Sequence, residues 1–340
     1  MLYPIERNNK FGLINRLGEE VVSPRFFGLG TPTKEGTVAT VSGDSFGVID
    51  HTGTFRIPAI YKSLGNFFSC GLLSAARASK HGYIDVNGVT VIDFLYLSAS
   101  HFSEDRASVK TGDRQYSFLD KSGRINGDRK FEQVRFYSDG RAGVVLNGKM
   151  GFVDLNGDLV IEPRYDSLAT GNFSEGHAFV CELSKTVLKC GLINKSGNAV
   201  LPLDFSGVGS VYKGIVKVSH FGGTAYVRVP SLDHSDLFDD ATDFCDSHAF
   251  VKTEQAWHII DSEFEVKGRV DYDNVNPFRA GCAIVEKDSK EGLVDFHGAA
   301  LSSIDFDELQ HIDGVLYEFV RGRESGYIDL KENVVWSSRA

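Results

Sequence analysis

The chain has 340 residues, of which 42% are hydrophobic and 11% are aromatic, so it can bury a sizeable core. Its formal net charge is −10 at pH 7, and it lacks the basic stripe that nucleic-acid binding over a broad surface requires. No stretch approaches the run of about 18 apolar residues that a membrane span needs. We therefore expect a globular protein that binds neither nucleic acid nor membrane.

The amino-terminal segment MLYPIERNNKFGLI has no basic region followed by an apolar stretch, so we expect no signal peptide. The cysteines are few, odd in number and scattered, which is typical of a protein of the reducing cytoplasm. They are Cys70, Cys181, Cys190, Cys245 and Cys282. Two of them, Cys181 and Cys190, flank the longest step of the repeat described next, across what reads as an extended hairpin. Whether they pair is left open, although a cytoplasmic location favours free thiols.

A glycine-centred pattern recurs along the whole chain with steps of 33 to 40 residues. If Gly12 in FGLI is taken as the marker, its equivalents are Gly47, Gly82, Ser117, Gly151, Gly191, Ala225, His258, Gly292 and Gly326. Such a period indicates a repeat architecture rather than an enzyme core. We expect a single array over residues 1–340, with ten units that begin near 1, 37, 72, 107, 141, 177, 215, 248, 282 and 315.

Each marker is followed by a short polar pattern. Three residues after it lie Asn15, Asp50, Asp85, Asp120, Asp154, Asn194, Asp261, Asp295 and Asp329, and six residues after it lie Gly18, Gly53, Gly88, Gly123, Gly157, Gly197 and Gly298. Asp or Asn at the first position of a turn accepts hydrogen bonds from the backbone two residues on, and Gly at the fourth position takes the left-handed conformation. The pattern G-φ-φ-D-x-x-G therefore predicts a hairpin turn, with acids that form the turn rather than catalyse or bind metal.

Aromatic side chains also keep the period. Fourteen residues after the marker lie Phe26, Tyr61, Tyr96, Phe131, Tyr165, Phe205, Tyr272 and Phe306, and the loops between units carry Phe102, Phe173, Phe244 and Phe278. A lone unit cannot bury its apolar face, whereas stacked units can, so we expect these rings to pack between neighbours. Ligand stacking is the alternative for any one of them.

Short β-branched and aromatic runs around the turns, such as LVIEP (159–163) and HAFV (177–180), predict strands, and no window has helical periodicity with good caps. The expected fold is all-β: a tandem array of three-stranded units in a propeller-like or ring-like arrangement, because no distinct capping unit ends the array. An open, curled β-solenoid is the alternative.

The unit resembles the WG repeat, also called the KWG repeat, whose pattern is similar to KWGFIDKTGKVVIPPKYD followed by FSEGLALV. Residues 149–180, KMGFVDLNGDLVIEPRYDSLATGNFSEGHAFV, carry the resemblance most clearly, and it extends over nearly the whole chain. The Trp that precedes the marker in the family is kept only at Trp257, where His258 replaces the glycine. The resemblance implies a repeat fold, but it implies no cofactor and no catalytic residue.

The pattern is interrupted in the seventh and eighth units. There the turn glycines become Ser231 and Phe264, the acid becomes Arg228, and the third strand is hard to place. The segment SLDHSDLFDDATDFCDSH (231–248) contains no Lys or Arg but has six acids: Asp233, Asp236, Asp239, Asp240, Asp243 and Asp246. We interpret it either as a solvated, degenerate repeat edge or as an electronegative patch for a basic protein partner. A calcium site is disfavoured because the D-x-D-x-D-G spacing is absent.

The chain contains no G-x-x-x-x-G-K-[ST], G-x-S-x-G, H-E-x-x-H or C-x-x-C motif, so we expect no enzyme, no cofactor and no metal site. We expect a cytoplasmic protein-binding scaffold, with an immunity-type protein that neutralises a cognate bacterial toxin as the preferred version. The partner-binding residues would be the six acids of the interrupted segment. The alternatives are a carbohydrate or cell-wall ligand module with aromatic platforms and, in last place, a hydrolase with a pocket in the array.

Overall fold

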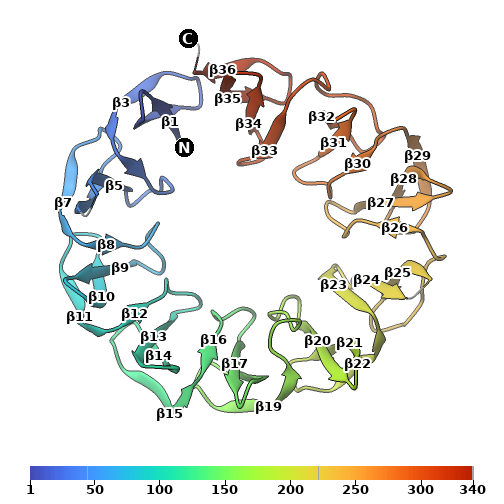
Figure 1. The fold of residues 1–340 in the computed structure, drawn as a ribbon, viewed down its shortest axis with the longest axis horizontal. Coiled ribbons are helices and arrows are strands. Elements are labelled where there is room, and N and C mark those ends of the chain that lie inside the picture. The colour runs from blue at the N-terminus through green and yellow to red at the C-terminus, as the bar shows by residue number, and fades with distance from the viewer. Residues whose placement is uncertain (44, 221, 339–340) are drawn as a thin grey trace. The chain divides into compact units, whose positions relative to one another are not determined.

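The computed structural model describes residues 1–43, 45–220 and 222–338, and over these residues the chain consists of strands and turns without a helix. It forms two compact units. Unit 1 comprises Met1–Phe173 with Lys195–Gly197, and unit 2 comprises Ser174–Asn194 with Asn198–Ala340. Within each unit, small antiparallel sheets follow one another along the chain (Figure 1).

Unit 1 contains five of these sheets. Their strands are β1 (Leu2–Arg7), β2 (Lys10–Asn15) and β3 (Glu20–Phe26); β4 (Gly28–Leu29), β5 (Thr37–Ser42), β6 (Ser45–Ile49) and β7 (Phe55–Tyr61); β8 (Ser63–Leu64), β9 (Leu72–Arg77), β10 (Lys80–Asp85) and β11 (Thr90–Tyr96); β12 (Ser98–Ala99), β13 (Arg106–Gly112), β14 (Gln115–Asp120) and β15 (Ile125–Phe131); and β16 (Gln133–Val134), β17 (Ala142–Leu146), β18 (Lys149–Val153) and β19 (Leu159–Asp166).

Unit 2 contains the other five sheets. Their strands are β20 (His177–Ser184), β21 (Val187–Asn194) and β22 (Ala199–Phe205); β23 (Gly207–Tyr212), β24 (Ile215–His220) and β25 (Gly223–Arg228); β26 (Asp240–Ala241), β27 (His248–Thr253), β28 (Ala256–Asp261) and β29 (Val266–Val270); β30 (Asn274–Val275), β31 (Ala283–Lys287) and β32 (Lys290–Val294); and β33 (Glu308–His311), β34 (Leu316–Arg321), β35 (Glu324–Asp329) and β36 (Val334–Ser337).

The two long strands of each repeat are where the pattern predicts them, because the expected unit starts fall within one residue of a long strand in every sheet. The expected three strands are incomplete, however, since six of the ten sheets have a fourth strand. In most of them this is a two-residue strand such as β4, which pairs with the first long strand after it. Two-residue strands lack the alternating pattern of a longer run, so the sequence gives little indication of them.

The marker glycines are explained by close contact with the third strand of the sheet. Between Met150 and Phe152 on β18 there is one residue, Gly151, while the opposing stretch of β19 has three, so β19 bulges over the glycine. A Cβ atom on Gly151 would lie 2.4 Å from the carbonyl oxygen of Ile161. Only glycine leaves room for that backbone.

The predicted turn chemistry is confirmed at Asp154. Its Oδ1 accepts hydrogen bonds from the backbone N–H groups of Asn156 at 2.9 Å and Asp158 at 3.0 Å. Gly157 closes this turn with φ of +84°, in the region that favours glycine. The acids of the repeat are therefore held by their own turns, as Asp120 and Asp295 also show.

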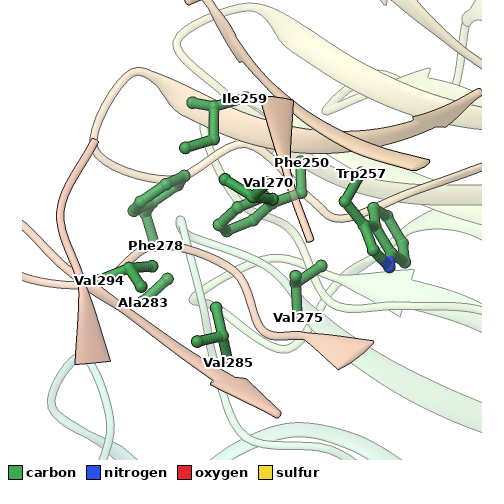
Figure 2. Packing of buried hydrophobic residues seen from close by; sticks show 9 residues of the cluster. All are labelled: Phe250, Trp257, Ile259, Val270, Val275, Phe278, Ala283, Val285 and Val294. Atoms are coloured by element: carbon green, nitrogen blue, oxygen red, sulfur yellow. The ribbon is translucent and has the colours of Figure 1, made fainter. Parts of the chain in front are cut away.

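Hydrophobic clusters fill the space between successive sheets. In one of them, Phe250 of β27 stacks on Phe278 of the β30–β31 loop at 4.6 Å between ring centroids, and Val285 of β31 packs nearby (Figure 2). The loop aromatics Phe102, Phe173, Phe244 and Phe278 are all buried, as expected. Of the aromatics fourteen residues after the marker, Phe26, Tyr61, Phe131, Tyr165 and Phe306 are buried, whereas Tyr96, Phe205 and Tyr272 are only half-buried.

Cys181 and Cys190 face each other on β20 and β21 and form a disulfide, with their Cα atoms 4.0 Å apart. Cys70, Cys245 and Cys282 are free. The free thiols that a cytoplasmic location favoured at Cys181 and Cys190 are therefore not observed. The direct pairing of the two residues across an antiparallel hairpin brings the sulfur atoms within bonding distance.

The fold class is all-β and propeller-like, because each repeat makes one small antiparallel sheet and, within each unit, successive sheets pack face to face as blades. The described residues include no helix long and apolar enough to cross a membrane. Closure of the ten blades into a ring stays a prediction.

Candidate functional site

The repeat is interrupted after β25: its two long strands are β24 and β25, and no regular strand follows β25 in the place that β3 and β19 take in their repeats. Residues 231–238 take its place and are attached to β25 by single bridges. Thr224 and Phe238 exchange two backbone hydrogen bonds of 2.8 Å, and the Ser235 N–H donates to the Tyr226 carbonyl at 2.9 Å. Because the turn glycine and the turn acid are both lost here, the chain cannot fold back as a regular hairpin.

A groove of about 650 Å³ lies between residues 232–237 of this segment and the preceding sheet, which ends at β22. Its floor and walls are apolar and include Leu201 and Phe205 of β22 and Val227 of β25. Phe205 is half-buried: one part of it lines this groove, and it also packs against the buried cluster that includes Leu201 and Val218. The volume is in the range of pockets that hold a ligand or a partner's side chain.

The outer rim of the groove comes from the interrupted segment itself. Leu232 and Leu237 line it while exposing 49% and 55% of their surface, and Asp236 stands between them. His220 and His234 also line the groove. An exposed apolar surface rimmed by polar groups is typical of a protein-interaction site.

Four of the six predicted acids are exposed on this part of the chain: Asp233, Asp236, Asp239 and Asp240. None of the four forms an ion pair with a Lys or Arg among the residues described. Asp240 is the first residue of β26, which pairs with β27, and Asp239 directly precedes it, so the exposed carboxylates run from the groove to the next blade.

The other two acids have different environments. Asp243 pairs with Lys217 of β24 at 3.1 Å, and the Oδ2 of Asp246 accepts a hydrogen bond from the Gly281 N–H at 3.0 Å. The expectation that all six acids are uncompensated is therefore wrong for Asp243. Its cation comes from a strand that precedes it by 26 positions, which local composition does not indicate.

A second exposed feature lies in unit 1, where three rings from successive loops form a row. Phe67, His101 and Phe136 lie 5.5 Å and 5.8 Å apart between centroids, and Phe67 and Phe136 expose 37% and 49% of their surface. The rings are tilted by 46° and 42° to their neighbours, so they form a stepped surface rather than one flat face.

The groove was not predicted from the sequence, because its walls come from β22 and from a segment with no repeat pattern. A signal was present in the loss of the glycine and acid at Ser231 and Arg228, but this signal marks an irregular strand and not a hollow. Among the described residues, no three or more His, Cys, Asp or Glu side chains are grouped to hold a metal ion.

Comparison with known proteins identifies the repeat. The sequence profile of the family described as "WG containing repeat" matches residues 46–77, 82–114, 116–149, 150–185, 191–220 and 270–290, which is more than half of the chain. None of the curated proteins matches it.

Two solved structures illustrate how far the likeness extends. The crystal structure of a eukaryotic initiation factor is similar over 87% of this chain and 93% of its own, with a TM-score of 0.55 and 10% identity. BamB from Moraxella catarrhalis covers 80% of this chain and 94% of its own, with a TM-score of 0.39 and 12% identity. At this identity the first likeness extends to the fold alone. The family matches, together with one blade per repeat, show that the chain belongs to the WG-repeat family.

Proposed function

We propose that this WG-repeat protein is a non-enzymatic scaffold that binds a protein partner with a basic surface. The observation that carries the proposal is the juxtaposition, on one interrupted blade, of an apolar groove and exposed carboxylates without cations. Asp236 lines the groove, and Asp233, Asp239 and Asp240 lie in the same segment.

The chemistry of the surface defines the partner. An apolar side chain of the partner would enter the groove beside Phe205, and flanking Lys or Arg side chains would meet the carboxylates. Hydrophobic burial in the groove supplies affinity, whereas complementary charge accelerates encounter and fixes orientation. A partner with an acidic surface would be repelled by the same four groups.

The finer version of the proposal is an immunity-type protein that neutralises a cognate bacterial toxin in the cytoplasm. Successive exposed carboxylates offer the negative groups that a nuclease-like target would otherwise find on a phosphate backbone. The disulfide between Cys181 and Cys190 counts against a reducing compartment, since such bonds are typical of oxidising ones. Trapping thiols in the source cell before lysis would test the location.

Catalysis by a thiol is disfavoured at the buried cysteine of unit 2. Burial raises the pKa of Cys282, so this thiol stays protonated at neutral pH and is a poor nucleophile.

The test is a binding experiment with matched charge removal. After a partner is captured from the source cell, its association rate is measured for wild type and for Asp236→Asn, Asp239→Asn, Asp240→Asn across salt concentrations. We expect the variant to associate about tenfold more slowly at low salt and to lose most of its salt dependence.

The control removes three exposed carboxylates from unit 1, with Asp128→Asn, Asp158→Asn, Glu162→Gln. It makes the same change in net charge and should leave the association rate within about twofold of wild type. Equal slowing in both variants would mean that net charge, rather than this surface, attracts the partner. No slowing in either would reject the proposed site.

The second candidate function is carbohydrate binding, and the row of Phe67, His101 and Phe136 favours it. Exposed aromatic faces stack on the apolar faces of sugar rings, and three successive rings suit an extended chain. Binding of soluble cell-wall glycan that is lost in Phe67→Ala, Phe136→Ala but kept in the triple Asn variant would support this reading over the first.

A further inference from the structure

In the propeller-like array, one loop position of each blade normally holds a buried aromatic ring. The position is defined by the backbone, because the next residue donates its N–H to a residue three or four positions on, at the start of the first long strand. The rings at this position are Phe68, Phe102, Tyr137, Phe173, Phe244 and Phe278, and all are buried.

The last blade departs from this rule. There Ile312 donates its N–H to the Leu316 carbonyl at 3.1 Å, so the position before it is His311. Both ring nitrogens of His311 are buried, and neither forms a hydrogen bond with another described residue. Burial of an unpaired polar group is unfavourable, and native structures rarely keep one without a reason.

A second rule of the array is broken at the same place. In unit 1, the residue after the ring is a serine whose hydroxyl donates to the carbonyl of the ring residue one blade on. Ser103 donates to Tyr137 at 2.7 Å, and Ser138 donates to Phe173 at 2.7 Å. By the same alignment, the residue in the place of the serine one blade before His311 is Arg279, which follows Phe278.

Arg279 therefore brings a cation to the position from which a serine would donate to the His311 carbonyl. Its positive charge acts on the imidazole, and Arg279 forms no ion pair among the residues that the structure describes. Burial, aided by Arg279, lowers the pKa of His311, so the ring is neutral at pH 7, with one N–H donor and one acceptor nitrogen. Asp246 and Asp313 oppose this shift, but both carboxylates accept backbone N–H groups.

His311 and Arg279, the two residues that depart from the pattern of the array, both line one cavity of about 520 Å³. Its polar lining includes Arg279, His311 and Gln310, and its apolar lining includes Phe278, Ile284 and Leu309. Phe278 also belongs to the cluster of Figure 2, so this part of the cavity wall is backed by packed side chains. This size and this mixture of apolar walls with a few converging polar groups are typical of small-molecule sites.

We propose that this cavity binds a small organic carboxylate with an apolar body. The carboxylate pairs with the Arg279 guanidinium and accepts the N–H of neutral His311, while the apolar body lies against Leu309 and Ile284. The other ring nitrogen accepts from a water or hydroxyl that enters with the ligand. The site is separate from the protein-binding groove, which is lined by β22, β24, β25 and residues 232–237.

The test uses phenylacetate as the probe, with phenylacetamide and phenethylamine as neutral and cationic counterparts of the same shape. Titration calorimetry on the full chain should give binding of phenylacetate that is at least about tenfold tighter than binding of either counterpart. The imidazole nitrogens of His311 should shift in NMR spectra on addition of phenylacetate. Phenylacetate should also slow alkylation of Cys245, which lines the cavity, without slowing that of exposed Cys70.

The variants restore the rule of the array, so they should fold. His311→Phe returns the aromatic ring, and Arg279→Ser returns the serine; each should weaken phenylacetate binding at least about tenfold. Arg269→Gln, which removes an exposed arginine from β29, is the control and should bind like wild type. Equal binding of acid and amide, unchanged binding in His311→Phe, or no binding of phenylacetate to wild type would each overturn the proposal.

Discussion

The two compact units follow the same repeat with different regularity. In unit 1, every sheet has its third strand, and the serines Ser69, Ser103 and Ser138 connect successive blades through their hydroxyl groups. In unit 2, no regular strand follows β25 or β32 as the third strand of its repeat, and Cys245 and Arg279 replace the serine. The groove and the His311 cavity both lie in unit 2.

The marker position shows how a regular third strand limits the exposure of side chains on the strand beside it. Gly151 is required because β19 bulges over it, whereas His258 pairs residue for residue with Arg269 of β29 and has room for a side chain. Ala225 faces an irregular segment in place of a third strand. Where the third strand is regular, it covers the blade; where it is lost, side chains become available for binding.

The largest expected effect is at the marker glycine. Gly151→Ala places a Cβ atom 2.4 Å from a backbone oxygen, so it should lower the free energy of unfolding by about 3 kcal/mol. The matched change in unit 2, Ala225→Gly, should lower it by only about 1 kcal/mol. Chemical denaturation measures both free energies of unfolding. Equal effects would mean that the third strand is not the reason why the marker position requires glycine.

The disulfide of unit 2 should give the next largest effect. Cys181→Ala with Cys190→Ala removes a bond that joins residues nine positions apart, and the free energy of unfolding should fall by about 2 to 3 kcal/mol. Thiol titration of the unfolded, unreduced wild type should count three free thiols. A count of five would show that the bond is not formed in the isolated protein.

The serine series tests the contacts between blades. Ser103→Ala leaves the Tyr137 carbonyl without its donor and should lower the free energy of unfolding by about 1 to 2 kcal/mol. Arg279→Ser in unit 2 should change it by less than about 0.5 kcal/mol, because this arginine forms no such bond. If Arg279→Ser destabilised as much as Ser103→Ala, the two units would not differ in this respect.

The smallest expected effect is a gain. His311→Phe replaces two unpaired nitrogens with an apolar ring, and the free energy of unfolding should rise by about 1 kcal/mol. Thermal unfolding without added ligand measures this. A loss of stability would mean that the imidazole is satisfied within the protein and is not reserved for a ligand.

Much of the fold could be predicted because its determinants are local. The turn acids, the turn glycines and the strand starts depend on neighbours a few residues away, so a repeated pattern reveals them. The short strands such as β4 were missed because two residues carry no periodicity. The disulfide depended on a compartment that the sequence does not establish.

The candidate sites were predictable only in part. The exposure of Asp233, Asp236, Asp239 and Asp240 follows from their charge, but the pairing of Asp243 with Lys217 depends on a different strand. His311 was missed although a signal existed, since the loop aromatics of six blades align with it. His311 aligns with those aromatics only if one extra residue is allowed in the loop before Leu316.

We propose that the irregular unit 2 carries the protein-binding surface. The most direct measurement is hydrogen–deuterium exchange of the full chain with and without its captured partner. We expect protection on binding to concentrate in residues 231–241 and β22, with unit 1 unchanged. Protection confined to unit 1, for example around Phe67 and Phe136, would contradict it and place the binding surface on the regular blades.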